Sequence, residues 1–390
     1  MLPRVMGANA RLERQALLSD GDSMEKGYGT GEHQGKNAGQ SGRPGWLDPQ
    51  DSTGLLPEVW MSWLDDDLPV SAISIPGTHD SAAFTYSWPF VATQNMSILE
   101  QLDAGIRYFD LRCGIRENIV EMVHGSTYLG LKFSDVLQTM YDWLDTHSSE
   151  GLVVQVKHDR QDSRTNINFA HAIANVIDQN GLRWRTANTT PTVGELRGRI
   201  QLFRRFHGHS LGSYGLNVTE WQDNPHTPFT IYTSHCTKIT VQDHYSWPDP
   251  KGLPGLVAEK GGDVAGLLNR AADDLDIHHW YINFTSAYEL NFYYQISPKE
   301  IALGGYWGFK WEVGMNVRLR NFLDEKTGRR RRYGIVAMDF PEAGVEDLIL
   351  QVIMSNFEQK LSALWDILCF WLPLVMVLAT VIALVILIMT

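Results

Sequence analysis

Cysteine is scarce in this chain, which has only Cys113, Cys236 and Cys369 among its 390 residues. No two of them have the CxxC spacing of many structural zinc sites, so the sequence predicts no zinc cluster. An odd and widely spaced set also argues against a disulfide framework and favours a reducing compartment.

Positive charge is also in short supply. The chain has 33 Lys and Arg against 45 Asp and Glu, a formal net charge of −12. Nucleic acid is therefore excluded as the main partner, because binding its phosphates needs clustered basic residues. With 44% hydrophobic residues, the composition is that of a globular protein with a large core.

Large apolar residues are sparse near the N-terminus. Residues 1–50 are rich in Gly, Ser, Asn and Gln, and we expect a disordered tail there because so little surface can be buried. The opening MLPRVMGANARLERQ lacks the apolar run of a secretory signal. A signal for import into the secretory lumen is therefore not predicted.

The C-terminus differs, since the 24 residues of 367–390 carry no charge. As a helix this run would be roughly 36 Å long, enough to cross a hydrocarbon core of about 30 Å. We therefore expect a C-terminal transmembrane anchor at 367–390, with a cytosolic catalytic domain and the membrane as a partner. A buried core helix is the alternative, and a GPI-anchor signal would require entry into the lumen.

Between these ends, strand-like and helix-like segments alternate. This pattern favours a parallel sheet covered by helices, so the fold class is α/β, a (β/α)₈ TIM-type barrel that allows irregularities, over residues 55–360. The expected strands are Val70–Ile75, Tyr108–Arg112, Ile119–Val123, Leu152–Lys157, Ile200–Arg204, Thr230–Tyr232, Trp280–Phe284 and Gly334–Met338. The expected helices are Phe133–Thr146, Asn168–Gln179, Leu256–Leu275 and Pro298–Ala302.

Polar side chains stand at the carboxyl ends of these strands, where a closed α/β barrel has its active site. Asp110 and Arg112 are two residues apart, so they point to the same side of one strand. Charges facing a barrel interior are unfavourable unless they are paired or functional. The strand-end residues are His79, Arg112, His124, Lys157, Arg205 and Asp339.

Two histidines and an arginine are the groups that cleavage of a phosphodiester by a neighbouring hydroxyl requires. One histidine takes the proton of the hydroxyl and the other returns a proton to the leaving alkoxide. Arginine remains charged and its planar fork matches phosphate oxygens. Taken singly, each of these residues is more often structural; the combination points to chemistry.

The motifs that carry these residues resemble the phosphatidylinositol-specific phospholipase C family of the X-domain type, in its bacterial-like, metal-independent branch. The resemblance covers roughly residues 60–350. It rests on THDS (78–81), FDLR (109–112), HG (124–125) and YINFTS (281–286), with LRGRIQLFRRF (196–206), TVQDHY (240–245) and YGIVAMDF (333–340) in the same order.

The resemblance implies six catalytic residues. His79 would be the general base on the inositol 2-hydroxyl, oriented by Asp339. His124 would be the general acid toward the diacylglycerol oxygen, assisted by Asp80. Arg112 would bind the phosphate where the signalling branch of the family has calcium, and Asp110 would support Arg112 and His124.

The resemblance also implies a substrate-binding set of Lys157, Asp159, Arg205, Asp243 and Tyr245, with Tyr245 stacking on the inositol ring. Two positions depart from the bacterial pattern, because Asp159 stands where Glu is usual and MVHG has one histidine where two are common. Both departures bear on substrate range more than on catalysis.

The implied reaction converts a phosphatidylinositol-like lipid to a cyclic inositol phosphate and diacylglycerol. No metal and no other cofactor is expected, since Arg112 would repel a cation, and the enzyme is expected to be a monomer. Two alternatives remain: a catalytically silent, membrane-tethered phosphoinositide-binding module, and a metal-dependent phosphodiesterase on the same barrel. Aromatic residues near Trp88 and Trp307 either rim the pocket and enter a lipid interface, or pack loops onto the barrel.

Overall fold

A computed structural model describes residues 55–208, 211–326 and 330–357. Within them, twelve strands form one sheet, and β7, β5, β2, β1, β16, β11 and β10 are neighbouring parallel strands in that order. The strands of this sheet are β1 (Ile75–Thr78), β2 (Tyr108–Arg116), β3 (Ile119–His124), β4 (Thr127–Lys132), β5 (Leu152–His158), β6 (Trp184–Arg185), β7 (Ile200–Arg205), β8 (Leu216–Asn217), β9 (Phe229–Tyr232), β10 (Lys238–Gln242), β11 (Trp280–Phe284) and β16 (Ile335–Met338).

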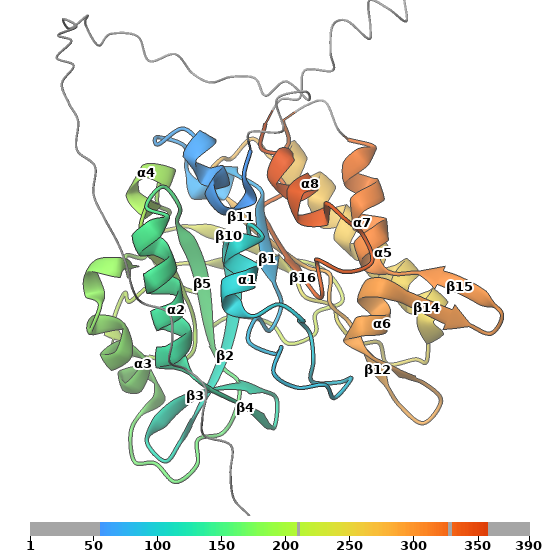
Figure 1. Cartoon of the computed structure of the whole chain (residues 1–390), viewed down its shortest axis with the longest axis horizontal. Coiled ribbons are helices and arrows are strands. Elements are labelled where there is room, and N and C mark those ends of the chain that lie inside the picture. Colours follow the sequence, from blue (N-terminus) through green and yellow to red (C-terminus); the bar gives the residue numbers. More distant parts are fainter. Residues whose placement is uncertain (1–54, 209–210, 327–329, 358–390) are drawn as a thin grey trace, which may run out of the picture. The chain divides into compact units, whose positions relative to one another are not determined.

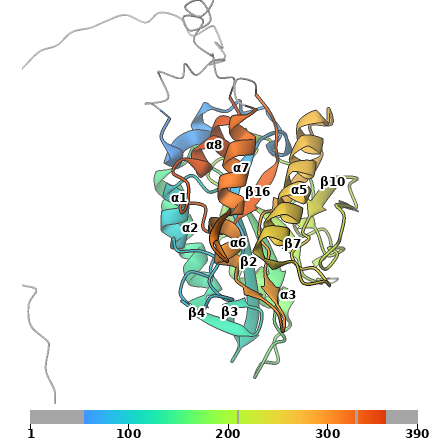
Figure 2. The same ribbon diagram turned by 90° about the vertical axis from the view of Figure 1, so that its right-hand side faces the viewer.

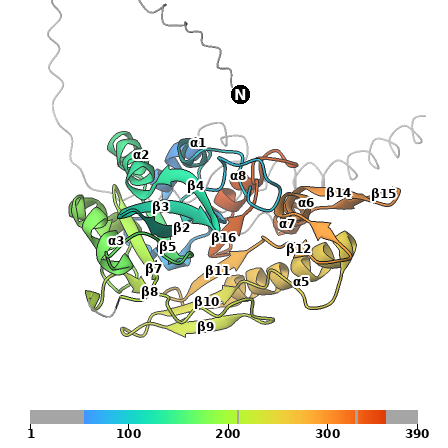
Figure 3. The same ribbon diagram turned by 90° about the horizontal axis from the view of Figure 1, so that it is seen from below.

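Helices lie outside the curved sheet, as the view from below in Figure 3 shows. In α2, the buried residues Val136, Leu137, Met140 and Leu144 recur every three or four positions, so one face of the helix packs inward. The helices are α1 (Ile98–Asp103), α2 (Phe133–Thr146), α3 (Phe169–Asp178), α4 (Val193–Leu196), α5 (Gly252–Asp273), α6 (Pro298–Leu303), α7 (Met315–Asp324) and α8 (Leu348–Met354).

The barrel is open along one seam. In the described part of the chain, no strand pairing joins β7 or β8 to β9 or β10. Side chains bridge the seam instead: the rings of Phe203 and Trp280 meet edge to face at 5.0 Å, and Trp280 Nε1 donates to Thr190 Oγ1. Arg205 at the end of β7 therefore faces Asp243, just after β10, without a backbone ladder between them.

Hairpins project from the carboxyl ends of the strands. Figure 1 shows β3–β4 and the small hairpin of β12 (Glu289–Leu290) and β13 (Gln295–Ile296) at the lower end of the barrel, with α8 at the opposite end. The turn from β2 to β3 has positive φ at Glu117 and Asn118, which suits a tight two-residue hairpin. A third hairpin, β14 (Gly304–Trp307) with β15 (Lys310–Val313), extends sideways.

Several sequence expectations need correction. Residues 70–72 form a short 3₁₀ helix, and the first strand begins only at Ile75, so the apolar pattern alone placed it too early. The predicted strand Ile119–Val123 pairs antiparallel with β2 and is therefore no member of the parallel barrel. The parallel strand β10 is missing from the strands expected from the apolar pattern, although the motif TVQDHY (240–245) overlaps it. The expected strand 230–232 belongs to the antiparallel edge strand β9.

The predicted fold class also included a transmembrane helix at 367–390, and this part is corrected. None of the helices among the described residues is long and apolar enough to cross a membrane. Residues 367–390 lie outside those residues, so the fold that the structure supports is the mixed α/β barrel alone. The expected tail at 1–50 also lies outside the described residues, and the expected domain limits of 55–360 stay a prediction.

Candidate active site

Polar side chains meet at the mouth formed by the carboxyl ends of the strands. His79 follows β1, Arg112 lies on β2, His124 ends β3, and Asp339 follows β16. Figure 2 shows the β3–β4 hairpin at the same lower end of the barrel as the other strand ends. Parallel register explains the convergence, because β1 pairs directly with both β2 and β16.

His79 lies between an acceptor and a donor. Its Nδ1 is 2.8 Å from Asp339 Oδ1, and its Nε2 is 2.8 Å from Arg112 Nη2. Because a guanidinium N–H can only donate, Nε2 carries the lone pair and the proton lies on Nδ1, facing Asp339. Burial, and then the charge of Arg112, lower the pKa of His79 well below its ordinary value. His79 is thus a neutral imidazole whose lone pair points into the site.

Arg112 is held by three carboxylates. Its Nε and Nη2 each lie 3.2 Å from Asp110 Oδ2, and its Nη1 lies 3.3 Å from Asp80 Oδ2 and 3.8 Å from Asp159 Oδ2. Burial alone would lower the pKa of Arg112, but these carboxylates raise it well above its usual value. Asp110 also accepts a 2.7 Å hydrogen bond from Gln155, so the carboxylate that orients the guanidinium is itself fixed.

His124 faces the same guanidinium from the other side, through Asp80. Its Nδ1 is 2.7 Å from the carbonyl oxygen of Val91, which places a proton on Nδ1, and its Nε2 lies 3.4 Å from Asp80 Oδ2. Asp80 has a positive φ of 45° and is held by hydrogen bonds around it, such as the one from Thr93 Oγ1 to its carbonyl oxygen. His79 Nε2 therefore contacts Arg112 directly, and His124 Nε2 is connected to it through Asp80.

A second set of side chains extends from the guanidinium toward the seam. Lys157 is paired with Asp159, and Asp159 Oδ2 accepts a hydrogen bond of 3.1 Å from the backbone of Gly125. Across the seam, Arg205 Nη2 lies 3.6 Å from Asp243 Oδ2. Burial, followed by the charge of Arg112, lowers the pKa of Lys157. This set alternates cations and carboxylates, which suits the donors and acceptors of a polyhydroxylated ring.

Tyr245 lies at the edge of this set. Its hydroxyl donates to Asp223 Oδ1 at 2.8 Å, and its ring stacks against Tyr288 with centroids 6.0 Å apart. No contact of its side chain with Lys157 or Arg205 is found among the described residues. Direct side-chain contacts therefore join eight of the eleven predicted residues around Arg112. Arg205 and Asp243 form a separate pair beside them, since Arg205 is the strand neighbour of Lys157, and in the described part of the chain Tyr245 has neither kind of contact with the cluster.

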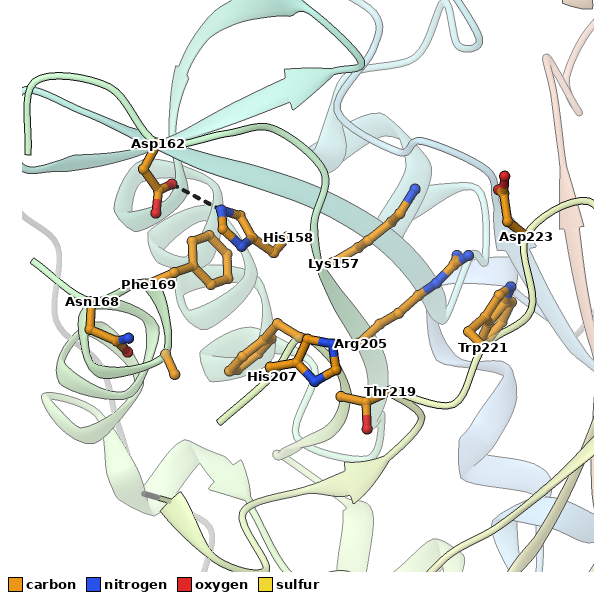
Figure 4. A pocket seen from close by; sticks show the side chains of 12 residues that line it. Lys157, His158, Asp162, Asn168, Phe169, Arg205, His207, Thr219, Trp221 and Asp223 are labelled. Atoms are coloured by element: carbon orange, nitrogen blue, oxygen red, sulfur yellow. Dashed lines mark hydrogen bonds and ion pairs between the residues drawn. The ribbon is translucent and has the colours of Figure 1, made fainter. Parts of the chain in front are cut away.

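A pocket of about 500 Å³ adjoins Lys157 and Arg205. Figure 4 shows both side chains extending toward Trp221 and Asp223, while His158, Asp162 and Phe169 line the opposite part. His158 Nε2 lies 2.9 Å from Asp162 Oδ1, and its ring stacks on Phe169 at 3.9 Å. The candidate site therefore extends from the cluster around Arg112 into this pocket beside Lys157 and Arg205.

Sequence reasoning missed Trp221. Its ring lies 4.0 Å from the guanidinium carbon of Arg205, and its Nε1 donates to Asp243 Oδ2 at 2.8 Å. Trp221 lies in an irregular segment and carries no strand pattern, so no local signal identified it. Gln155 was also missed, although its place two residues before Lys157 on an apolar strand is a usable signal.

Carboxylates surround a cation that the chain itself provides. In the part of the chain that the structure describes, no group of three or more His, Cys, Asp or Glu side chains is arranged to hold a metal ion. Asp80, Asp110 and Asp159 converge on the guanidinium of Arg112.

Comparisons with known proteins show which family the chain resembles. Residues 69–206 match the family model described as phosphatidylinositol-specific phospholipase C, X domain. A 1-phosphatidylinositol phosphodiesterase of Staphylococcus aureus is 31% identical over 323 residues, which cover 78% of this chain and 96% of the relative. A protein of the same name from Listeria monocytogenes is 28% identical over 310 residues, covering 76% of this chain and 84% of the relative.

Solved structures give the same result. The phosphatidylinositol-specific phospholipase C of S. aureus superimposes with a TM-score of 0.64 at 25% identity, covering 77% of this chain and 97% of the other. The enzyme of L. monocytogenes superimposes with a TM-score of 0.58, also at 25% identity, covering 77% of this chain and 99% of the other. The strand-end motifs and the fold of the present chain, together with these relatives, show that it belongs to the phosphatidylinositol-specific phospholipase C family of the X-domain type.

Proposed function

We propose that this protein cleaves phosphatidylinositol-like lipids to a cyclic inositol phosphate and diacylglycerol. The observation that carries the proposal is the placement of two imidazoles around one guanidinium, with the lone pair of His79 Nε2 directed at it. The names of the relatives support the substrate class, since they are 1-phosphatidylinositol phosphodiesterases.

In the proposed reaction, His79 Nε2 takes the proton of the inositol 2-hydroxyl. The 2-oxygen forms a bond to phosphorus, and the bond from phosphorus to the diacylglycerol oxygen breaks. His124, protonated on Nε2 beside Asp80, gives its proton to the leaving oxygen. Each transfer contributes roughly 10² to 10⁴ in rate, and Arg112 balances the charge on the equatorial oxygens.

Arg112 has two tasks in this scheme. Before substrate binds, its Nη2 covers the lone pair of His79. A phosphate oxygen is a stronger acceptor than an imidazole, so an arriving phosphate draws the guanidinium away and exposes Nε2. Binding of the phosphate and release of the base are thereby coupled, and the base is free only when a substrate is present.

The head group would lie along the side chains that lead from Arg112 to the seam. Donors and acceptors for the ring hydroxyls would come from Lys157, Arg205, Asp159 and Asp243. Tyr245 would lie at the edge of this head-group site. Every group in this scheme comes from one chain, so a monomer suffices.

Exposed aromatic residues give the mouth a lipid-facing edge in this proposal. Trp88 is 64% exposed on the loop that follows His79, and Phe292 and Tyr293 are 97% and 71% exposed between β12 and β13. Trp and Tyr favour the boundary between water and hydrocarbon. These positions fit contact with the surface of the bilayer that contains the substrate.

The deciding experiment incubates the full chain with phosphatidylinositol vesicles and follows the products by phosphorus NMR. A cyclic inositol phosphate should form with the wild type and be absent with His79→Ala and with His124→Ala. Lack of turnover by the wild type would favour the silent binding module. Loss of activity in EDTA, restored by a divalent cation, would favour the metal-dependent phosphodiesterase.

A further inference from the structure

Lys260 is a cation for which the proposed reaction has no use. It lies in the middle of α5 yet is fully buried. Its ammonium donates to Gln242 Oε1 at 3.0 Å and to the carbonyl oxygen of His244 at 2.6 Å, and both acceptors are uncharged. No carboxylate among the described residues forms an ion pair with it. A buried ammonium without a direct counter-ion is unfavourable for stability. Lys260 is therefore expected to serve a role other than stabilising the fold.

The two acceptors of Lys260 flank Asp243. Gln242 is the last residue of β10, and its Oε1 also accepts from the backbone of His244, so the ammonium closes a tight loop around Asp243. Asp243 is the residue that spans the open seam, contacting Arg205 and Trp221. No strand pairing among the described residues fixes that seam, so Asp243 is held there by the backbone loop that carries it and by its contacts with Arg205 and Trp221.

The same network reaches the catalytic side. Gln242 Nε2 donates to Asn283 Oδ1 at 2.8 Å and to the carbonyl oxygen of Phe284 at 2.9 Å. The ring of Phe284 meets His79 edge to face at 5.8 Å. Lys260 therefore joins the end of β10 to the end of β11 beneath the site.

Acidic groups surround Lys260 at a distance, without forming an ion pair with it in the described part of the chain. The acidic groups that face Lys260 are Asp243 after β10, Asp263 on α5 and Asp339 after β16. Burial nevertheless lowers its pKa to about 8, with these carboxylates opposing the shift.

We propose that Lys260 is a positioning residue: its buried ammonium fixes the turn after β10 so that Asp243 is aimed across the seam before a head group arrives. The role rests on the proposed function, because Asp243 belongs to the head-group set. Lys260 itself touches no substrate. Its loss should weaken head-group binding while the proton-transfer groups stay in place.

The test uses the full chain with Lys260→Met and with Lys260→Gln, which keeps a donor but no charge. The matched control is Lys251→Met, which removes a partly exposed lysine paired with Glu259 at the start of the same helix. The probes are soluble dihexanoyl phosphatidylinositol for kinetics and myo-inositol 1-phosphate for calorimetry. KM and the dissociation constant should both rise about tenfold, with kcat changed less than threefold and the control unaffected.

A double mutant tests whether Lys260 acts through Asp243. If Lys260 acts through Asp243, Lys260→Met added to Asp243→Asn should weaken binding no further than Asp243→Asn alone. The wild-type affinity should also fall as the pH rises through about 8, where the ammonium of Lys260 loses its charge. Lys260→Met should show a smaller fall, because Lys157, whose pKa is also lowered by burial, titrates in both proteins.

Unchanged KM and affinity in a folded Lys260 variant would overturn the proposal, as would effects of Lys260→Met and Asp243→Asn that simply add. A fall in kcat alone, in proportion to the fraction of folded enzyme, would overturn it as well. Calorimetry keeps the two proposals separate: a wild type that binds inositol phosphate without turnover refutes the reaction, while the Lys260 comparison still stands or falls on affinity.

Discussion

The Nη2 atom of Arg112 lies 2.8 Å from Nε2 of His79. One hydrogen bond thus connects the group proposed to bind phosphate with the group proposed to accept the proton. This contact holds the imidazole in its neutral form with the lone pair facing the site.

The acid limb of the pH–rate profile should lie at a lower pH than the pKa of an ordinary histidine. Burial and then Arg112 lower the pKa of His79, and in the proposed reaction the neutral imidazole is the active form. The rate should therefore hold as the pH falls through 6.5 and decline only at lower pH. Measuring kcat/KM for dihexanoyl phosphatidylinositol from pH 4 to 8 checks this.

Arg112→Gln removes one cause of the lowered pKa, so the acid limb of its residual activity should move upward. A limb that stays in place would show that Arg112 does not act on His79. A wild-type limb at or above pH 6.5 would contradict the assignment of His79 as a buried neutral base.

Arg112→Lys should lower kcat by about 10²- to 10³-fold, because an ammonium cannot contact two phosphate oxygens in one plane while it also faces Asp110. Arg116→Lys, on the same strand but half-exposed and paired with Glu121, is the control and should keep wild-type kinetics. Steady-state assays on the soluble substrate measure both. Near-normal kcat for Arg112→Lys would show that a point charge suffices.

Trp221→Phe should raise KM roughly threefold to tenfold with little change in kcat. The phenyl ring can still cover Arg205, but the 2.8 Å hydrogen bond from Nε1 to Asp243 is lost, worth about 1 kcal/mol. Trp63→Phe, at the end of the 3₁₀ helix Pro57–Trp63, is the matched control. An unaltered KM for Trp221→Phe would remove Trp221 from the head-group site.

Glu150→Gln should destabilise the fold by roughly 3 kcal/mol, because it leaves the buried Arg107 without its counter-ion. Arg107 donates to Glu150 Oε2 through Nε at 3.0 Å and Nη2 at 2.8 Å, at the end of the barrel opposite the mouth. Urea unfolding measures the loss, and activity per folded molecule should stay normal. Glu117→Gln breaks an exposed pair with Arg164 and should change stability by less than about 1 kcal/mol.

Much of the candidate active-site cluster could be predicted from sequence because its signals are local. Asp110 and Arg112 share one face of a strand through their spacing alone, and both histidines follow short apolar runs. The parallel strand ends then bring these residues together. The contact of His79 with Asp339, 260 positions apart, followed from the resemblance and not from any local pattern.

Other features depend on contacts that a linear pattern does not encode. Ile119–Val123 has the composition of a barrel strand, but the tight turn at Glu117 and Asn118 folds it back on β2. Trp221 comes from an irregular segment, and Lys260 looks like an ordinary helical lysine until the helix is packed on β10 and β11. Burial and partners at long sequence distance decide such cases.

Among the described residues no strand pairing joins β7 to β10, so this part of the barrel is held together differently from the rest. Backbone hydrogen bonds fix the distances between β1, β2 and β16. The side chains at the ends of these strands, which include His79 and Arg112, are held by that pairing. At the gap, the separation of Arg205 from Asp243 is set by side chains alone. In the proposed head-group site, a substitution at this gap should therefore change the separation of Arg205 from Asp243 while the strand pairing beside His79 and Arg112 is kept.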